Sequence, residues 1–379
     1  MDKRTFAALF ILLLSGTSFS SHAQTLRNLN LQQALDVAAA QNKDIKRSGI
    51  MHKLAEEEVA EQKERRIPEV DFHASYARIT NLTSFPTGFK NVVVDETIPE
   101  WADITATARL PLYEGGAIKN KIKKAEQALK ISKINIEKTL YDTKIEVIAN
   151  FLGIFKLMEL QKLIRENIHE EEDRLREVRE CRKHGTVTTN EVLRAEVQLS
   201  DMEVKLLANK HHINVALFQL HTLLELPDDE QLQIDTTQLL AQSMPLLQEK
   251  DAYLTLALQK DEMRIVAEKQ AISKTDVKIA KSNFFPKISL FGAYAGNYPN
   301  YMFFPPVANP YTYGKIGLEA TWSISGLYKN KTKVHMAHLD QERQNVDAEI
   351  LKNRIQDKVF SEYSQLEEMQ EKLPVMEHA

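Results

Sequence analysis

The stretch DITATARLPLYEGGAIKNKIKKAEQALK, Asp103–Lys130, decides the fold, because its pattern changes in the middle. In the first ten residues apolar and polar side chains alternate, which is the pattern of a strand with one apolar face. The polar face begins with Asp103 and ends with Arg109. The apolar face carries Ile104, Ala106, Ala108, Leu110 and Leu112.

A predicted junction follows this strand. Pro111 removes a ladder donor, and the pair Gly115-Gly116 permits an abrupt change of direction. A highly charged helix is then expected over 117–183, with a length of about 100 Å. The stretch therefore predicts a strand with one apolar face that leads into a helix too long for a compact domain.

The same order of elements occurs twice along the chain: helix, proline, strand, loop, strand, glycine and helix. Pro68 and Pro286 are 218 residues apart, and Gly115 and Gly326 are 211 apart. This duplication predicts a first structural repeat over 24–226, an irregular connector over 227–245 and a second repeat over 246–379. Helices are expected over 31–66, over 117–183, from the end of a turn at 184–191 to about 226, over 246–283 and from about 328 onward. Strands are expected over 70–79, 103–112, 287–296 and 313–324, with a turn-rich loop over 80–100 between the first two.

Each predicted strand has about ten residues, the length that crosses a bilayer when the strand is tilted by about 45°. Aromatic residues lie at or near the strand ends, as in a membrane girdle. Four strands cannot close a barrel, and an open edge in lipid is costly, so several copies would have to share one barrel. A small antiparallel sheet packed on helices remains the alternative. In the barrel, the polar face would line the lumen with Asp71, Arg109, Lys287, Lys315, Glu319 and Thr321.

Composition narrows the class of protein. The 379 residues are 43% hydrophobic and 27% charged with only 12 glycines and 12 prolines, which favours long helices. A net charge of -4 gives no support for nucleic-acid binding. The single cysteine, Cys181, cannot form an intramolecular disulfide.

Residues 1–23 have the pattern of a signal peptide. Lys3 and Arg4 precede a short apolar run, and Ser21-His22-Ala23 resembles a cleavage site. A buried N-terminal helix is the alternative. Since no later stretch of about 18 apolar residues exists, a helical membrane span is not expected.

The helix predicted over 117–183 has two apolar seams at 3-4 spacing. The first includes Val147, Phe151 and Ile154 and is broken by Ser132 and Thr143; the second includes Tyr141, Ile145 and Leu152. Two seams require a neighbouring helix on each side. The angle between the seams around the helix axis is close to the interior angle of a ring of about 12 helices. A helical tube is therefore predicted, with a solid bundle as the alternative.

The order and spacing of several segments resemble the TolC-type outer-membrane efflux protein family over the whole mature chain. These segments are LNLQQALDVAAAQNKDIK, RRIPEVDF, LPLYEGGAIKNK, HGTVTTNEVLRAEVQL and NFFPKISL. The resemblance implies a homotrimer in which each chain adds four strands to a shared barrel above a helical tunnel. It implies a passive exit duct, for efflux or type I secretion, that crosses the outer membrane and extends into the periplasm. Its partners would be a periplasmic adaptor, an inner-membrane transporter and outer-membrane lipid.

The turn between the two helices of the first repeat is the expected adaptor contact under this resemblance. It comprises Gly185, Val187, Thr188, Asn190 and Glu191. A well-capped turn without a partner explains the same residues.

The chain departs from the family pattern in two places. The second glycine pair is reduced to Gly326-Leu327, and by analogy with the first repeat a further helical hairpin is expected after the last residue, Ala379. A truncated conduit without function is therefore one alternative.

No enzyme, metal or cofactor is expected. His335 and His338 lack the carboxylate or cysteine set of a zinc motif, and no nucleophilic or paired-carboxylate constellation is evident. The main rival is a soluble periplasmic coiled-coil adaptor, which the four bilayer-length strands do not favour.

Overall fold

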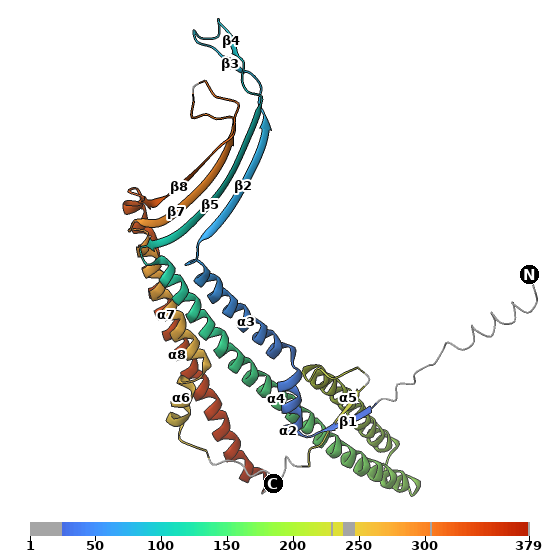
Figure 1. The fold of residues 1–379 in the computed structure, drawn as a ribbon. Helices are drawn as coiled ribbons and strands as arrows, with labels where there is room; N and C mark the ends of the chain where they lie inside the picture. Colours follow the sequence, from blue (N-terminus) through green and yellow to red (C-terminus); the bar gives the residue numbers. More distant parts are fainter. Residues whose placement is uncertain (1–24, 229, 238–246, 304, 378–379) are drawn as a thin grey trace, which may run out of the picture. The chain divides into compact units, whose positions relative to one another are not determined.

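The computed structural model describes residues 25–228, 230–237, 247–303 and 305–377 (Figure 1). The chain divides into two compact units, Met1–Ser48 with Lys138–Leu246 and Gly49–Glu137 with Leu247–Ala379. The predicted signal peptide and part of the connector, 238–245, lie outside the described residues. The prediction of two repeats stays a prediction.

The first unit joins the start of the described chain to a segment about 200 residues later. Strand β1 (Thr25–Leu29) pairs in parallel with β6 (Glu230–Ile234). Helix α2 (Leu31–Gln41) follows and begins with a capping box: the Gln33 N–H donates to Asn30 Oδ1 at 2.8 Å, and the Asn30 N–H donates to Gln33 Oε1 at 3.0 Å. The unit also contains α5 (Thr189–Leu223) and the later part of α4 (Ala117–Lys183).

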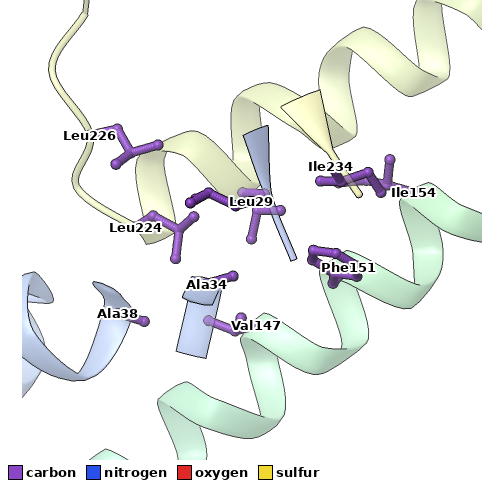
Figure 2. Close-up of a cluster of buried hydrophobic side chains, with 10 residues drawn as sticks. Leu29, Ala34, Ala38, Val147, Phe151, Ile154, Leu224, Leu226 and Ile234 are labelled. Atoms are coloured by element: carbon purple, nitrogen blue, oxygen red, sulfur yellow. The ribbon is translucent and has the colours of Figure 1, made fainter. Parts of the chain in front are cut away.

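A hydrophobic core holds these elements together (Figure 2). Val147, Phe151 and Ile154 of α4 are fully buried, which confirms that the first seam of the predicted helix is a packing surface. They meet Leu29 of β1 and Ile234 of β6 in one cluster. The cluster also contains Ala34, Ala38, Leu220, Leu224 and Leu226.

The second unit contains a curved four-stranded sheet (Figure 1). Its strands are antiparallel in the order β2, β5, β7, β8, so the two predicted hairpins pair through β5 and β7. The strands span Glu69–Arg78, Glu100–Glu114, Lys287–Tyr298 and Tyr311–Thr321, respectively. A small hairpin of β3 (Leu82–Ser84) and β4 (Val93–Asp95) lies in the segment expected to be a loop.

Polar contacts fix how the helices of this unit pair. The helices are α3 (Lys43–Glu64), α6 (Lys250–Leu258), α7 (Asp261–Ser282), α8 (Gly326–Glu377) and the first part of α4. Between α4 and α7, Thr275 Oγ1 donates to Gln127 Oε1 at 3.0 Å in a buried position. Between α3 and α4, His52 Nδ1 lies 2.8 Å from Ser132 Oγ, which accounts for the polar interruption of the seam at Ser132.

Two predicted helices are interrupted. The helix expected over 31–66 breaks at Asn42, where ψ is 129° and the side-chain oxygen accepts from the Asp44 N–H at 2.9 Å, so that Asn42 ends α2 and starts α3. The helix expected over 246–283 is also divided, because Lys260 is extended between α6 and α7.

The connector expected to be irregular contains β6. Its Ile234 is buried in the core beside Leu29, and that contact depends on chain pairing across about 200 residues. Such a distant partner leaves no local signal in the sequence.

Candidate functional site

The four-stranded sheet has one apolar face that is exposed. Val70 and Phe72 at one edge are 71% and 73% exposed, and Ile316 and Leu318 at the other are 80% and 69% exposed. A contiguous apolar surface of this kind marks a contact with lipid or protein. The register places on this apolar face Val70, Phe72, Ala74, Tyr76, Ile104, Ala106, Ala108, Leu110, Leu290, Tyr294, Ile316 and Leu318.

The opposite, polar face collects the charged residues that the alternation placed together. A ladder row is a line of residues that are paired directly across neighbouring strands. One such row runs from Asp71 through Thr107 and Ala293 to Lys315. Strand alternation from this row puts the other predicted residues on the same face: Arg109, Lys287, Glu319 and Thr321.

An ion pair crosses the polar face. Arg109 Nη2 on β5 lies 3.1 Å from Glu319 Oε2 on β8, so the pair reaches over β7 to the edge of the sheet. Lys315 Nζ lies 6.0 Å from the ring centroid of Phe291, a cation–π contact. The aromatic Phe291 on a polar face was not anticipated from the sequence. The surrounding hollow has a volume of about 480 Å³, and its lining includes Asp71, Asp103, Arg109, Phe291 and Lys315.

The passage from β5 to α4 depends on two glycines. Gly115 and Gly116 have φ of +62° and +82°, in the left-handed region that favours glycine. A Cβ at Gly115 would lie 2.5 Å from the carbonyl oxygen of Ser282 and 2.9 Å from Cβ of Phe285. Gly115 is therefore required both by its backbone angles and by the close approach of the end of α7.

Pro111 and Gly326 differ from expectation. Pro111 lies inside β5, which continues to Glu114, and the register shifts between Pro111 and Tyr113. Leu112 is thus the extra residue of a bulge and does not continue the apolar row. Gly326 begins α8 and is not among the described glycines with positive φ; a Cβ there would lie 3.0 Å from Asn330 Nδ2, so close packing explains it.

Two side chains after β8 cap the end of α7. Asn330 Nδ2 donates to the carbonyl of Asn283 at 2.9 Å, and Trp322 Nε1 donates to the carbonyl of Phe284 at 3.1 Å. The last carbonyls of a helix lack intrahelical donors, so these bonds satisfy groups that would otherwise need water. Both strand-to-helix passages therefore meet at the end of α7. This meeting point could not be predicted from local pattern, because the hydrogen-bonded partners are 38 and 47 residues apart in the sequence.

The predicted adaptor contact is the turn between α4 and α5. Gly185 has φ of +76°, and Thr186 donates from its N–H and its hydroxyl to the Cys181 carbonyl at 3.0 and 2.7 Å. Thr188 occupies the N-cap of α5 without a side-chain capping bond. Val187 is half-buried, whereas Thr188, Asn190 and Glu191 are exposed, and Glu191 bonds to Arg194 at 3.2 Å.

Apolar helix faces remain exposed in the first unit. Tyr141 and Ile145 of the second seam of α4 are 51% and 48% exposed, in contrast with the buried first seam. On α5 the exposed apolar side chains include Leu193, Val197, Val204, Leu207, Val215 and Phe218.

The described part of the chain contains no cluster of three or more histidine, cysteine, aspartate or glutamate side chains that could hold a metal ion. Among the described helices, none is long and apolar enough to cross a membrane.

Several solved outer-membrane proteins share this fold. The outer-membrane channel OprN has a TM-score of 0.73 and 16% sequence identity, with 92% of this chain and 76% of that chain covered. The MtrE outer-membrane channel of Neisseria gonorrhoeae, in its open state, has a TM-score of 0.68 and 15% identity, with coverage of 92% and 75%. The outer-membrane protein VceC of Vibrio cholerae has a TM-score of 0.67 and 14% identity, with coverage of 92% and 83%.

No curated protein matches the sequence. The family model for outer membrane efflux proteins matches residues 34–225, which is just over half of the chain. That segment includes β2, β5, the glycine junction and both helices of the α4–α5 hairpin. The chain belongs to the outer membrane efflux protein family.

Proposed function

We propose that this protein is the outer-membrane exit duct of a tripartite efflux or type I secretion system. Three copies share one β-barrel, their helices form a tunnel into the periplasm, and substrates pass without energy input from the duct itself. A signal peptide directs export, and a periplasmic adaptor and an inner-membrane transporter are the partners. The observation that carries the proposal is the four-stranded sheet with an exposed apolar face and an open edge on each side.

The two faces of the sheet suit lipid on one side and water on the other. Large apolar side chains on β2 and β8 are about 70–80% exposed, and the polar face carries ions that water can solvate. In lipid an unpaired edge is prohibitively costly, because its N–H and C=O groups find no partner. In the described residues, β2 and β8 each have only one neighbouring strand, so edges of other copies would have to complete the sheet.

The two edge strands are offset along the sheet. Glu69, the first residue of β2, lies in the ladder row of Gly317, and β8 continues for four more residues to Thr321. β5 and β7 also reach the row of Thr321, with Glu114 and Lys287, so the whole offset lies between β2 and β5. An offset of this size lets the end of β8 in one copy lie level with the start of β2 in the next.

Three copies suit a conduit better than two. Two copies would supply eight strands, and the interior of such a barrel is filled by side chains. Phe291 and Tyr313 on the polar face would occupy much of that space. Twelve strands leave room for a lumen, in agreement with the three-fold assembly that the family resemblance implies.

The native mass of the protein tests this proposal. After extraction from outer membranes with mild detergent, we expect a species of about three times the chain mass of 43.4 kDa, absent from the soluble fraction. A soluble monomer would refute the shared barrel and favour the coiled-coil adaptor.

A matched pair of variants tests which face meets lipid. Leu318→Asp puts a charge on the apolar face and should abolish the assembled species, because a charge facing the hydrocarbon costs several kcal/mol over three copies. Ser289→Asp puts the same charge on the polar face and should assemble normally. Equal assembly of both variants would contradict the proposed orientation.

The adaptor contact is tested at the turn between α4 and α5. Val187→Asp together with Thr188→Lys should block transport, because charged side chains replace a half-buried apolar residue and its neighbour at the tip. The yield of the assembled species should be unchanged. Transport at the wild-type level would remove this turn from the adaptor contact.

A further inference from the structure

We propose that β8 of one copy pairs with β2 of the next in a single register, in which Lys315 lies opposite Ser75. This inference rests on the proposed shared barrel and deepens it, because it assigns the residues that two copies bring together. Within one chain, the ladder row of Lys315 contains Asp71 of β2. Ser75 lies four residues further along β2, so the proposed register between copies is shifted by four residues from that internal row.

The direction of the strands and the face that each side chain occupies restrict the possible registers between β8 and β2. The four strands alternate in direction, so β8 and the β2 of a following copy are antiparallel like every other neighbouring pair. On both edge strands the odd-numbered residues lie on the polar face, for example Asp71 and Lys315. A shift by one residue would turn every side chain of one strand to the other face. The shift from the internal row is therefore an even number.

Barrel tilt and strand length then select the shift. Apart from the bulge at Leu112 in β5, the ladder rows run straight across the four strands of one chain, so nearly all the shear of a closed ring has to arise where two copies meet. With about 3.3 Å per residue and about 4.8 Å between strands, shifts of zero, two, four and six give tilts of about 0°, 19°, 35° and 46°. Only the last two suit a barrel. A shift of four pairs all ten residues of β2 with β8, whereas a shift of six leaves Glu69 and Val70 beyond the end of β8.

Side chains on the apolar face fit this register. Leu318 lies opposite Phe72, and Ile316 lies opposite the small Ala74. Gly314 lies opposite Tyr76, so the aromatic ring covers a position without a side chain. The large members of these pairs, which are among the most exposed side chains of the sheet edges, gain cross-strand neighbours.

On the polar face the register brings Asp71 opposite Glu319, two like charges. Arg109 resolves this conflict, because its guanidinium already lies 3.1 Å from Glu319 at the edge of the sheet. Arginine has five N–H donors and binds carboxylates by two parallel bonds or binds two carboxylates at once. Each junction between copies would then hold one arginine between a carboxylate of its own chain and Asp71 of the next.

Disulfide trapping tests the register. In a Cys181→Ser background, which removes the only native thiol, Lys315→Cys is combined in turn with cysteine at one of four positions of the polar face of β2. Directly opposite residues have Cα atoms about 4.5–5.5 Å apart, within disulfide range, whereas diagonal neighbours lie at about 7–8 Å. The four positions are Asp71, His73, Ser75 and Ala77.

Oxidation in native outer membranes should give covalently linked copies most strongly with Ser75→Cys, by at least about five-fold over Asp71→Cys and Ala77→Cys. A maximum at any other position would overturn the register. A second pair in the same register, Tyr313→Cys with Ala77→Cys, provides an independent check if the lysine variant assembles poorly, and its failure to cross-link in an assembled species would also overturn it.

The register between copies and the shared barrel can be refuted separately. If the native mass remains that of three copies but no pair cross-links, β8 does not pair with β2 in this way, and the conduit stands. If the protein in the membrane is a monomer, the shared barrel itself is refuted.

Discussion

Replacing Gly115 by alanine should destabilise the passage from β5 to α4 more than the same change at Gly116. Both glycines have positive φ, which costs a residue with a Cβ about 1–2 kcal/mol. Only at Gly115 does the new Cβ also meet other atoms, 2.5 Å from the Ser282 carbonyl oxygen and 2.9 Å from Cβ of Phe285. At Gly116 the nearest such atom is 3.7 Å away, an ordinary contact.

The carbonyl oxygen cannot yield without moving the end of α7, because the Phe285 N–H donates to that oxygen at 3.1 Å. Overpacking against atoms that cannot move costs about 1–3 kcal/mol. The expected total is therefore about 2–5 kcal/mol for Gly115→Ala and about 1–2 kcal/mol for Gly116→Ala. The difference corresponds to roughly 5- to 150-fold in the unfolding equilibrium.

Urea unfolding in detergent, followed by tryptophan fluorescence, measures this difference. The chain has two tryptophans, and Trp101→Phe leaves Trp322, whose indole donates to the carbonyl of Phe284 at the same junction. Gly115→Ala should unfold at a clearly lower urea concentration than Gly116→Ala. Equal midpoints for the two variants would refute the argument that contact with α7, in addition to backbone angle, requires glycine at position 115.

Three further changes test contacts described above. Ser132→Ala should lower the free energy of unfolding in urea by about 0.5–1.5 kcal/mol, because it leaves His52 Nδ1 without its partner at 2.8 Å. Adding His52→Leu to this variant should recover part of the lost stability, and a further loss would argue against this explanation. Asn330→Ala should lower the free energy of unfolding by about 1–3 kcal/mol, since a carbonyl at the end of α7 loses its donor at 2.9 Å; an unchanged urea midpoint would show that water replaces the amide. Bonds from the N–H and the hydroxyl of Thr237 lower the pKa of Asp235, so this contribution to stability is present above the unfolded pKa and is lost as the pH falls through the lower folded pKa. Thr237→Val, which removes the hydroxyl bond and keeps the N–H bond, should therefore melt below the wild type near pH 6, with the gap closing as the pH falls through the folded pKa of Asp235; a gap independent of pH would contradict the assignment.

Local pattern predicted the parts of this molecule that depend on neighbouring residues. The two faces of the sheet follow from alternation, because successive side chains of a strand point to opposite sides. The helix expected over 117–183 has those bounds, since Gly115-Gly116 stands before it and Gly185 after it. All three glycines have positive φ, which is incompatible with a right-handed helix and explains why the helix does not extend past them in either direction.

Contacts between distant segments were not predictable in the same way. The Ser132 hydroxyl interrupts an apolar seam in the sequence, and only the structure shows His52 as its partner. The caps that Trp322 and Asn330 place on α7 require that two strand-to-helix passages meet at one point. The charged residues of the polar face could be assigned to one face, but the reach of Arg109 across β7 to Glu319 depends on the register between strands.

The pairing of β1 with β6 makes the core of the first unit depend on a contact between distant residues. Thr25 pairs with Glu230, and Leu29 with Ile234, so the loop that this pairing closes contains about 200 residues. Helices such as α4 form in microseconds from local contacts, whereas contacts between distant residues form slowly. During folding, β1 is thus among the last elements to be paired, and until then it exposes an edge that other chains could bind.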